Sequence, residues 1–269
     1  MARLICALLL PLLTLAAQTS ITFGTVSKEV MERNLHAVQD SNLKREQALH
    51  SMFEEAGCTG DQLREQPLKH VKSPNIICAL PGETDSVILV GAHTDFVDRG
   101  KGVVDNWSGC SLLPALFTSL KAVPRRHTFV FVGFTDEELG LVGSKFYVRE
   151  LGQAGLEKLN AVVNLDSLGT GPTKFEMDRA DQSLADAFLK VASSVKLPLN
   201  VVNAHKVGRS DSDSFQDRKV PTINIHSLTQ ETFPILHTSR DRMDAIRFDD
   251  YYDSYLLIHV YLAYLDKVR

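Results

Sequence analysis

The chain has 269 residues, of which 44% are hydrophobic, and a formal net charge of −4. That hydrophobic content can fill the core of one domain, or at most of two small ones. The Lys and Arg residues are scattered along an acidic chain, which argues against a nucleic-acid surface, because such surfaces gather cations in one patch.

The first residues are typical of an export signal. One Arg precedes the apolar run LICALLLPLLTL, and two alanines follow it. The run falls short of the ~20 apolar residues that a membrane helix needs, and Pro11 interrupts it. We therefore expect residues 1–17 to be a signal peptide cleaved near Ala17, and residues 18–269 to form one secreted or periplasmic domain without a membrane segment.

The sequence has four cysteines, and cleavage of the signal would leave Cys58, Cys78 and Cys110. Export permits disulfides, so Cys58 and Cys78 could pair. Buried free thiols are an equally good interpretation. No CxxC pair occurs, which excludes a zinc site built from thiolates.

Two periodicities alternate along the rest of the chain. Apolar residues from about Ser27 to Gly57 recur at helical spacing and predict one or two helices. Strands are expected at NIICAL from Asn75, SVILVGA from Ser86, HTFVFVGF from His127, NAVVNL from Asn160 and VPTINI from Val220. Helices are expected from about Ser108 to Ala122, from about Leu139, from about Gln182 and over the closing FDDYYDSYLLIHVYLAYL. Strands this apolar are covered on both faces, which predicts a three-layer α/β/α domain with a mixed, centrally parallel sheet.

Three of these strands end in polar clusters. The clusters are His93-Thr94-Asp95, Asp136-Glu137-Glu138 and Asp166. Open α/β sheets bind ligands beyond the carboxyl ends of their strands, so we expect one shared site. Carboxylates gathered in a crevice take up protons unless a cation compensates them. Imidazole and carboxylate ligands without thiolates favour zinc, with manganese or cobalt as substitutes.

Each residue taken singly has an ordinary explanation. Asp136 or Asp166 could cap a helix, and Glu137 and Glu138 could occupy the first turn of the helix that follows. His93 alone could be an ordinary core or surface histidine. The three clusters together favour a functional site.

Six segments carry a resemblance to the M28 peptidases, a family of co-catalytic zinc aminopeptidases. They are GAHTD (91–95), VDNWSG (104–109), FTDEELGLVGS (134–144), VNLDSLG (163–169), SDSDSF (210–215) and PILHTSRD (234–241). They occur in the family's order and cover the chain from about Asn75 to its end. The resemblance implies a single zinc-exopeptidase domain.

The resemblance also implies ligands for two zinc ions per chain. His93 and Asp166 would hold one ion, Glu138 and His237 the other, and Asp105 would bridge them. Two metals roughly 3.5 to 4 Å apart can share a water, lower its pKa and polarise the scissile carbonyl.

Two further carboxylates take catalytic roles by the same resemblance. Glu137 is similar to the family's general base, which moves a proton from the water to the leaving amine. Asp95 would accept the ring N–H of His93 and fix its tautomer. The peptide bond after Asp105 would be cis.

The sequence departs from the family pattern at two positions. Ser212 stands where a histidine is common, which makes a histidine contribution from that loop unexpected. Trp107 replaces a smaller residue, and could either shape a pocket wall or pack in the core. Nearby, Arg209, Asp211 and Asp213 could tether a substrate terminus or belong to a solvated loop.

We therefore expect an exported, dinuclear zinc aminopeptidase that acts on peptides. The spacing leaves no room for a lid or dimerisation domain, which favours a monomer. A glutaminyl cyclase with a single zinc and a carboxypeptidase of the same fold are the enzymatic alternatives. A non-catalytic receptor domain should lack ligands, and none is missing here.

Overall fold

The computed structural model describes residues 24–203 and 208–269. The expected signal peptide, residues 1–17, lies outside the described residues, and its cleavage stays a prediction. Within these two ranges, no helix is both long and apolar enough to cross a bilayer.

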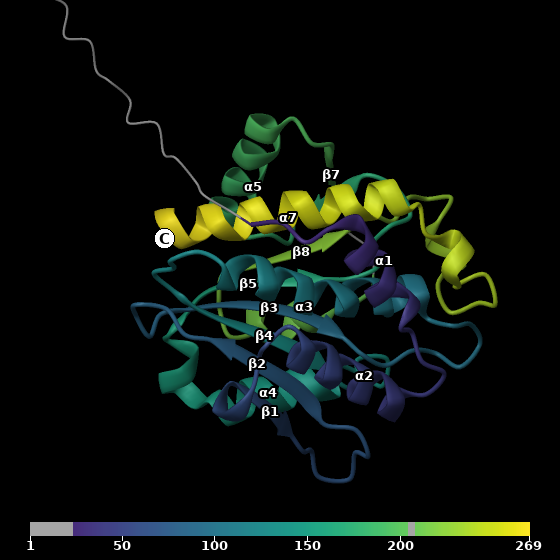
Figure 1. The fold of residues 1–269 in the computed structure, drawn as a ribbon, viewed down its shortest axis with the longest axis horizontal. Coiled ribbons are helices and arrows are strands. Elements are labelled where there is room, and N and C mark those ends of the chain that lie inside the picture. Colours follow the sequence, from purple (N-terminus) through teal and green to yellow (C-terminus); the bar gives the residue numbers. More distant parts are fainter. Residues whose placement is uncertain (1–23, 204–207) are drawn as a thin grey trace, which may run out of the picture.

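Eight strands form one mixed sheet at the centre of the molecule (Figure 1). They are β1 (Leu63–Gln66), β2 (Asn75–Leu80), β3 (Val87–His93), β4 (Thr128–Phe134), β5 (Leu159–Leu165), β6 (Thr173–Glu176), β7 (Leu199–Val202) and β8 (Thr222–His226). Their order in the sheet is β1-β2-β4-β3-β5-β8-β6-β7. The central pairs β4–β3, β3–β5 and β5–β8 are parallel, whereas β1–β2, β2–β4 and β8–β6 are antiparallel. The predicted mixed, centrally parallel sheet is confirmed.

Helices cover both faces of this sheet. They are α1 (Lys28–His36), α2 (Asn42–Glu55), α3 (Ser108–Lys121), α4 (Val142–Leu156), α5 (Gln182–Val195), α6 (Asp211–Gln216) and α7 (Phe248–Val268). Successive strand residues point to opposite faces, so Ile88 and Val90 join the core under α1, α2, α3, α5 and α7, while Leu89 joins the core under α4 and α6. The α/β/α layering follows from this alternation and confirms the predicted fold class.

The sequence patterns do not predict β1, β6, β7 or α6. Each of the three strands has four residues, and β1 (LREQ) is polar, so no apolar alternation marks it. Helix α6 (DSDSFQ) has six residues and begins with a capping box between Ser210 and Asp213. These elements are too short for periodicity to reveal them.

Cys58 and Cys78 form a disulfide that joins the segment after α2 to strand β2. Cys110 is a buried free thiol in α3. Of the two interpretations left open by the sequence, pairing holds for Cys58 and Cys78.

The segment before α1 packs against the last helix of the chain. The backbone N–H of Val26 donates to the hydroxyl of Tyr255 at 2.7 Å, and the hydroxyl of Tyr252 donates to the Val26 carbonyl at 3.2 Å. Residues 229 positions apart are thereby in contact.

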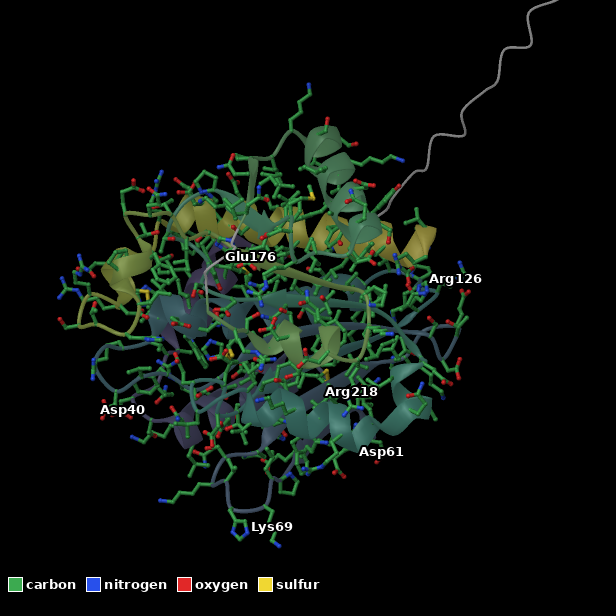
Figure 2. The ribbon with its side chains drawn as sticks, turned by 180° about the vertical axis from the view of Figure 1, so that it is seen from behind. Asp40, Asp61, Lys69, Arg126, Glu176 and Arg218 are labelled. Carbon is green, nitrogen blue, oxygen red and sulfur yellow. A yellow bond between two sulfur atoms is a disulfide. The ribbon has the colours of Figure 1, made fainter. Side chains whose placement is uncertain are left out.

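Charged side chains are spread over the surface. Figure 2 shows the labelled cations Lys69, Arg126 and Arg218 at widely separated points, with Lys69 at the tip of the loop between β1 and β2.

Candidate active site

The structure brings together all seven residues that the sequence analysis assigned to the site. His93 ends β3, Asp105 lies in the irregular turn before α3, Glu137 and Glu138 follow β4, Asp166 follows β5, and His237 and Asp95 lie in loops. Because β4, β3 and β5 are adjacent and parallel, their carboxyl ends meet at one edge of the sheet.

Asp105 lies between two histidines. Its Oδ1 is 3.1 Å from Nε2 of His93, and its Oδ2 is 3.1 Å from Nε2 of His237. Asp166 Oδ1 is 3.7 Å from the same nitrogen of His93, and Glu138 Oε1 is 2.9 Å from the same nitrogen of His237. Each carboxylate oxygen of Asp105 therefore faces a separate group of donor atoms.

The His93 group is enclosed, and the His237 group is open to solvent. The side chain of His93 is 2% exposed, whereas that of His237 is 49% exposed. His237 is therefore the more accessible of the two histidines.

Asp95 fixes the turn that carries the two adjacent glutamates. Its carboxylate accepts the backbone N–H groups of Glu137 at 2.9 Å and Glu138 at 3.1 Å. Nδ1 of His93 is hydrogen-bonded to the backbone carbonyl of Asp95 at 3.2 Å and lies 3.4 Å from its Oδ1, so the bond to the carboxylate that the resemblance implied stays a prediction. The two hydrogen bonds to the glutamate turn could not be predicted from the sequence, because they involve backbone atoms.

Several backbone conformations at the site are uncommon. The residues Asp136, Ser167 and His237 have positive φ angles of 51°, 62° and 58°. Such values are rare outside glycine and persist only where the surroundings enforce them. The Asp105–Asn106 peptide bond is cis, as the resemblance implied.

The carboxylates perturb one another strongly. Burial, with the negative charges of Asp211, Asp166 and Glu138, raises the pKa of Glu137 to about 9. Burial and the charge of Asp105 raise the pKa of Glu138 to about 7. A cation at the centre of the cluster would relieve both effects.

The histidines keep Asp105 ionised. Burial opposes this, but the contacts with His237 and His93 outweigh it and lower the pKa of Asp105. The same contact with Asp105 raises the pKa of His237 to about 9. Asp105 therefore carries its negative charge at neutral pH.

The donor atoms fit two metal ions that share one carboxylate. His93, Asp105 and Asp166 form one group of close donors, and Asp105, Glu138 and His237 form another; a third group, His93, Glu137 and Glu138, does not include Asp105. Oε1 of Glu138 is buried and has no hydrogen-bond partner, although it lies 2.9 Å from the His237 nitrogen. An oxygen and a nitrogen this close, but not aligned for a hydrogen bond, are suited to bind the same metal ion. Nitrogen and oxygen donors of this kind suit zinc.

Two further acids belong to the site. Asp241 accepts the backbone N–H of Val104 at 2.7 Å and that of Asp105 at 3.2 Å, and so holds the backbone at Asp105. Asp211 is 1% exposed, and burial, with the charges of Asp95 and Asp166, raises its pKa to about 7. Asp241 lies in PILHTSRD, one of the segments that resemble the M28 peptidases. Its hydrogen bonds to the backbone of Val104 and Asp105 could not be predicted from the sequence.

The remaining singled-out residues have structural contacts. Trp107 is fully buried and donates from Nε1 to the carbonyl of Asn34 at 3.2 Å, so it packs in the core. Arg209 pairs with Asp213 at 3.1 Å, and Ser212 is buried. The side chain of Arg209 is 55% exposed, so a role of this pair at a substrate terminus stays a prediction.

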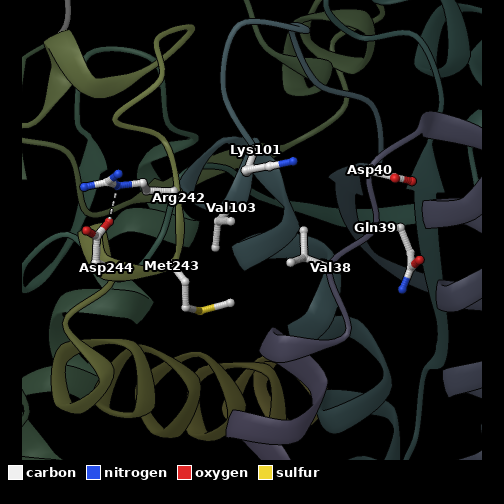
Figure 3. Close-up of a pocket in the computed structure, with 8 residues that line it drawn as sticks. All are labelled: Val38, Gln39, Asp40, Lys101, Val103, Arg242, Met243 and Asp244. Atoms are coloured by element: carbon white, nitrogen blue, oxygen red, sulfur yellow. Dashed lines mark hydrogen bonds and ion pairs between the residues drawn. The ribbon is translucent and has the colours of Figure 1, made fainter.

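A separate cavity of about 520 Å³ lies beside the segment that leads to Asp105 (Figure 3). It is lined by Val38, Gln39, Asp40, Lys101, Val103, Arg242, Met243 and Asp244. None of these residues belongs to the metal-binding groups.

Residues 75–260 match the family model of peptidase family M28. The chain belongs to peptidase family M28. This M28 chain is 30% identical over 156 residues to leupeptin-inactivating enzyme 1 of Streptomyces exfoliatus; the match covers 57% of the chain and 35% of that enzyme. The chain thus spans about a third of the length of this relative.

Solved structures share the fold of the M28 chain. A zinc aminopeptidase of Bacillus subtilis is 26% identical with a TM-score of 0.64, over 71% of this chain and 49% of that one. A glutaminyl cyclase of an Acidobacteriales bacterium is 17% identical with a TM-score of 0.72, over 93% of this chain and 99% of that one. The fold alone therefore does not separate peptidase from cyclase.

Proposed function

We propose that this M28 chain is a zinc aminopeptidase that holds two zinc ions, bridged by Asp105, and releases N-terminal residues from peptides. The observation that carries the proposal is the position of Asp105, whose two oxygens each lie 3.1 Å from a different histidine. One shared carboxylate between two donor groups is what a pair of metal ions requires.

The residues divide into three roles. His93 and Asp166 would bind one ion, Glu138 and His237 the other, and the pair would supply a water of lowered pKa and a polarised substrate carbonyl. Glu137 shares a donor group with His93 and Glu138 but lies outside the two groups that share Asp105, and we assign its carboxylate to accept a proton from the attacking water and deliver it to the leaving amine. Asp95 would orient His93 and hold the Glu137–Glu138 turn.

The proposal includes export and a monomeric state. The apolar run before Ala17 supports a signal peptide, and the Cys58–Cys78 disulfide suits an oxidising compartment. The uninterrupted single domain supports a monomer.

Metal content and substrate scope test the proposal together. Purified protein is analysed for bound metal, and hydrolysis of aminoacyl chromogenic amides is measured before and after chelation. We expect two zinc ions per chain and release that stops on chelation. N-acetylated substrates serve as the control, because an aminopeptidase needs the free amine.

Other outcomes identify the alternatives. One zinc ion, no hydrolysis and cyclisation of an N-terminal glutamine would establish the glutaminyl cyclase. Cleavage that survives N-acetylation but stops on C-terminal amidation would establish the carboxypeptidase. Protein that binds no metal would contradict all three enzymes.

A further inference from the structure

Arg45 of α2 is a fully buried cation that binds backbone carbonyl groups. Its Nε donates to Gln39 O at 3.1 Å, and its Nη1 donates to Gly102 O at 3.1 Å and to Thr94 O at 3.4 Å. Its Nη2 donates to Lys101 O. The planar guanidinium thus joins three separate stretches of chain.

Two of these stretches carry proposed metal ligands. Thr94 lies between His93 and Asp95, and Gly102 lies three residues before Asp105. Gly102 has a φ of 50°, and a side chain there would collide with Phe96. The Gly102 carbonyl is therefore held in a tight turn that leaves little freedom to the segment leading to Asp105.

The surroundings of Arg45 hold its guanidinium in place. The guanidinium carbon lies 4.1 Å from the ring centre of Phe96 and 5.8 Å from that of Trp107. Among the described residues no carboxylate forms an ion pair with it, and every hydrogen bond goes to a carbonyl oxygen. Burying a charge without an ion pair costs free energy, so we expect the buried Arg45 to provide a compensating benefit.

The neighbouring residue of α2 contacts the same region. Glu46 is 1% exposed, and its Oε1 accepts from the hydroxyl of Thr94 at 3.1 Å. The Thr94 hydroxyl also lies 3.0 Å from the carbonyl of Phe134, at the end of the strand that leads to Glu137. Arg45 and Glu46 therefore bind Thr94 from both its backbone and its side chain.

Arg45 also joins two walls of the cavity in Figure 3. Gln39 lies on one wall and Lys101 on another, and the carbonyls of both accept hydrogen bonds from Arg45. The guanidinium thus lies between the α1–α2 connection and the segment that leads to Asp105. Both sides of this junction would move apart if the hydrogen bonds were lost.

We propose that Arg45 is a positioning residue for the metal centre: it fixes the backbone segments that present His93 and Asp105. Arg45 lies outside residues 75–260, which match the M28 family model, so the catalytic unit of this chain extends into α2. The inference rests on the proposed function in taking His93 and Asp105 as metal ligands.

The test compares four variants in the full chain. Arg45→Met removes all the donors but keeps a long apolar stem, and Arg45→Lys keeps the charge but not the planar fork. Lys44→Met is the matched control, because the neighbouring side chain is 58% exposed. Phe188→Leu perturbs the core at α5, where the ring packs against Phe175 and Tyr261, and controls for lost stability.

Three quantities are measured: zinc affinity by competition with a chelating dye, hydrogen exchange of the amides of residues 93–105, and kcat and KM. Arg45→Met should weaken zinc binding about 10- to 100-fold, as loss of support for a ligand does elsewhere. It should speed exchange of these amides and lower kcat more than it raises KM. Arg45→Lys should fall between Arg45→Met and the wild type.

The controls separate positioning from general stability. Phe188→Leu should lower Tm but leave zinc affinity and the exchange of residues 93–105 unchanged, and Lys44→Met should resemble the wild type. Wild-type zinc affinity and exchange in Arg45→Met would overturn the inference. Should Arg45→Met fail to fold, Arg45→Lys decides by the same two readouts.

Failure of the proposed function gives a different pattern. Wild-type protein that binds zinc but cleaves no aminoacyl amide would contradict the aminopeptidase, while the zinc and exchange comparisons still decide the role of Arg45. If the wild type binds no zinc, hydrogen exchange of the amides of residues 93–105 alone decides the role of Arg45. Faster exchange in Arg45→Met than in Phe188→Leu then supports backbone positioning, and equal exchange contradicts it.

Discussion

Glu137 and Glu138 are adjacent in the sequence but have different surroundings. Oε1 of Glu138 is 2.9 Å from His237, whereas the pKa of Glu137 responds to burial and to the charges of Asp211 and Asp166. Both backbone N–H groups bind Asp95, so the turn holds the two side chains in fixed directions. Adjacent glutamates can thus serve as proton carrier and metal ligand.

Substitution of the two glutamates by glutamine should therefore have different effects. Glu137→Gln keeps the shape of the side chain but cannot accept a proton, and should lower kcat by ~10²-fold or more with both zinc ions retained. Glu138→Gln should lose one zinc ion per chain. Metal analysis alongside steady-state kinetics checks both, and two variants with equal metal content and near wild-type turnover would refute the assignment.

Asp241 offers a second prediction for a single residue. In Asp241→Asn, an NH2 group replaces one of the two carboxylate oxygens that accept from Val104 and Asp105. One buried backbone N–H would then lose its acceptor, which should lower the free energy of unfolding by ~1–3 kcal/mol. We expect a lower Tm, weaker zinc binding and a lower kcat. Asp244→Asn is the control, because Asp244 is 64% exposed and pairs with Arg242. Equal effects in the two variants would exclude a role for Asp241 at the site.

The sequence predicted some site residues from physical pattern and others only through resemblance. His93, Glu137, Glu138 and Asp166 directly follow apolar strands, so their meeting at one sheet edge could be derived. Asp105 and His237 lie in loops, and the family motifs alone singled them out. The contacts of Arg45 and Asp241 involve backbone atoms of distant segments, which no periodicity or motif reports.

At the scale of elements, the apolar strands β2, β3, β4, β5 and β8 were predictable and β1, β6 and β7 were not. Central strands are buried on both faces and therefore nearly all apolar. Strands β1 and β7, at the two edges of the sheet, are partly exposed and have four residues each, so the sequence carries no strong pattern for them. Such short segments gain their structure from the neighbours with which they pair.

Helix α7 contains a buried histidine that makes stability depend on pH. Burial lowers the pKa of His259 to about 4, below its usual value of about 6.5. The unfolded chain therefore binds more protons than the folded chain between these values, so stability falls as pH falls from about 6.5 to about 4. The loss from this residue amounts to up to about 3 kcal/mol.

His259→Phe should reduce this acid sensitivity. The ring of His259 stacks on Tyr255 with centres 6.0 Å apart, an arrangement that a phenyl ring can retain. Urea unfolding at pH 7 and pH 5, on protein freed of metal by a chelator, measures the change. We expect the difference between the two pH values to be smaller in the variant. An identical difference in both proteins would show that His259 does not titrate on unfolding.

For the molecule as a whole, the charges of Glu137, Glu138 and Asp211 lower the stability of the metal-free fold. Burial and mutual repulsion raise the pKa values of Glu137, Glu138 and Asp211, so each charge is unfavourable in the metal-free fold. A ligand that binds only the folded state stabilises it by about 3 kcal/mol at a hundred times its Kd.

Zinc should therefore raise Tm, and chelation should lower it. Calcium, which prefers a larger number of oxygen ligands, should have little effect at the same concentration. Differential scanning calorimetry with chelator, zinc and calcium checks the prediction. A Tm that does not respond to zinc would show that the carboxylates are balanced in some other way.

The contact between Val26 and Tyr255 also bears on when the chain can complete its fold. Synthesis proceeds from the N-terminus, so α1 emerges long before the helix on which its leading segment rests. Met31 and Leu35 of α1, both buried in the finished core, stay incompletely covered until α7 has left the exit tunnel. The core around α1 is therefore completed only after α7 has been synthesised, and until then these apolar side chains can take part in aggregation.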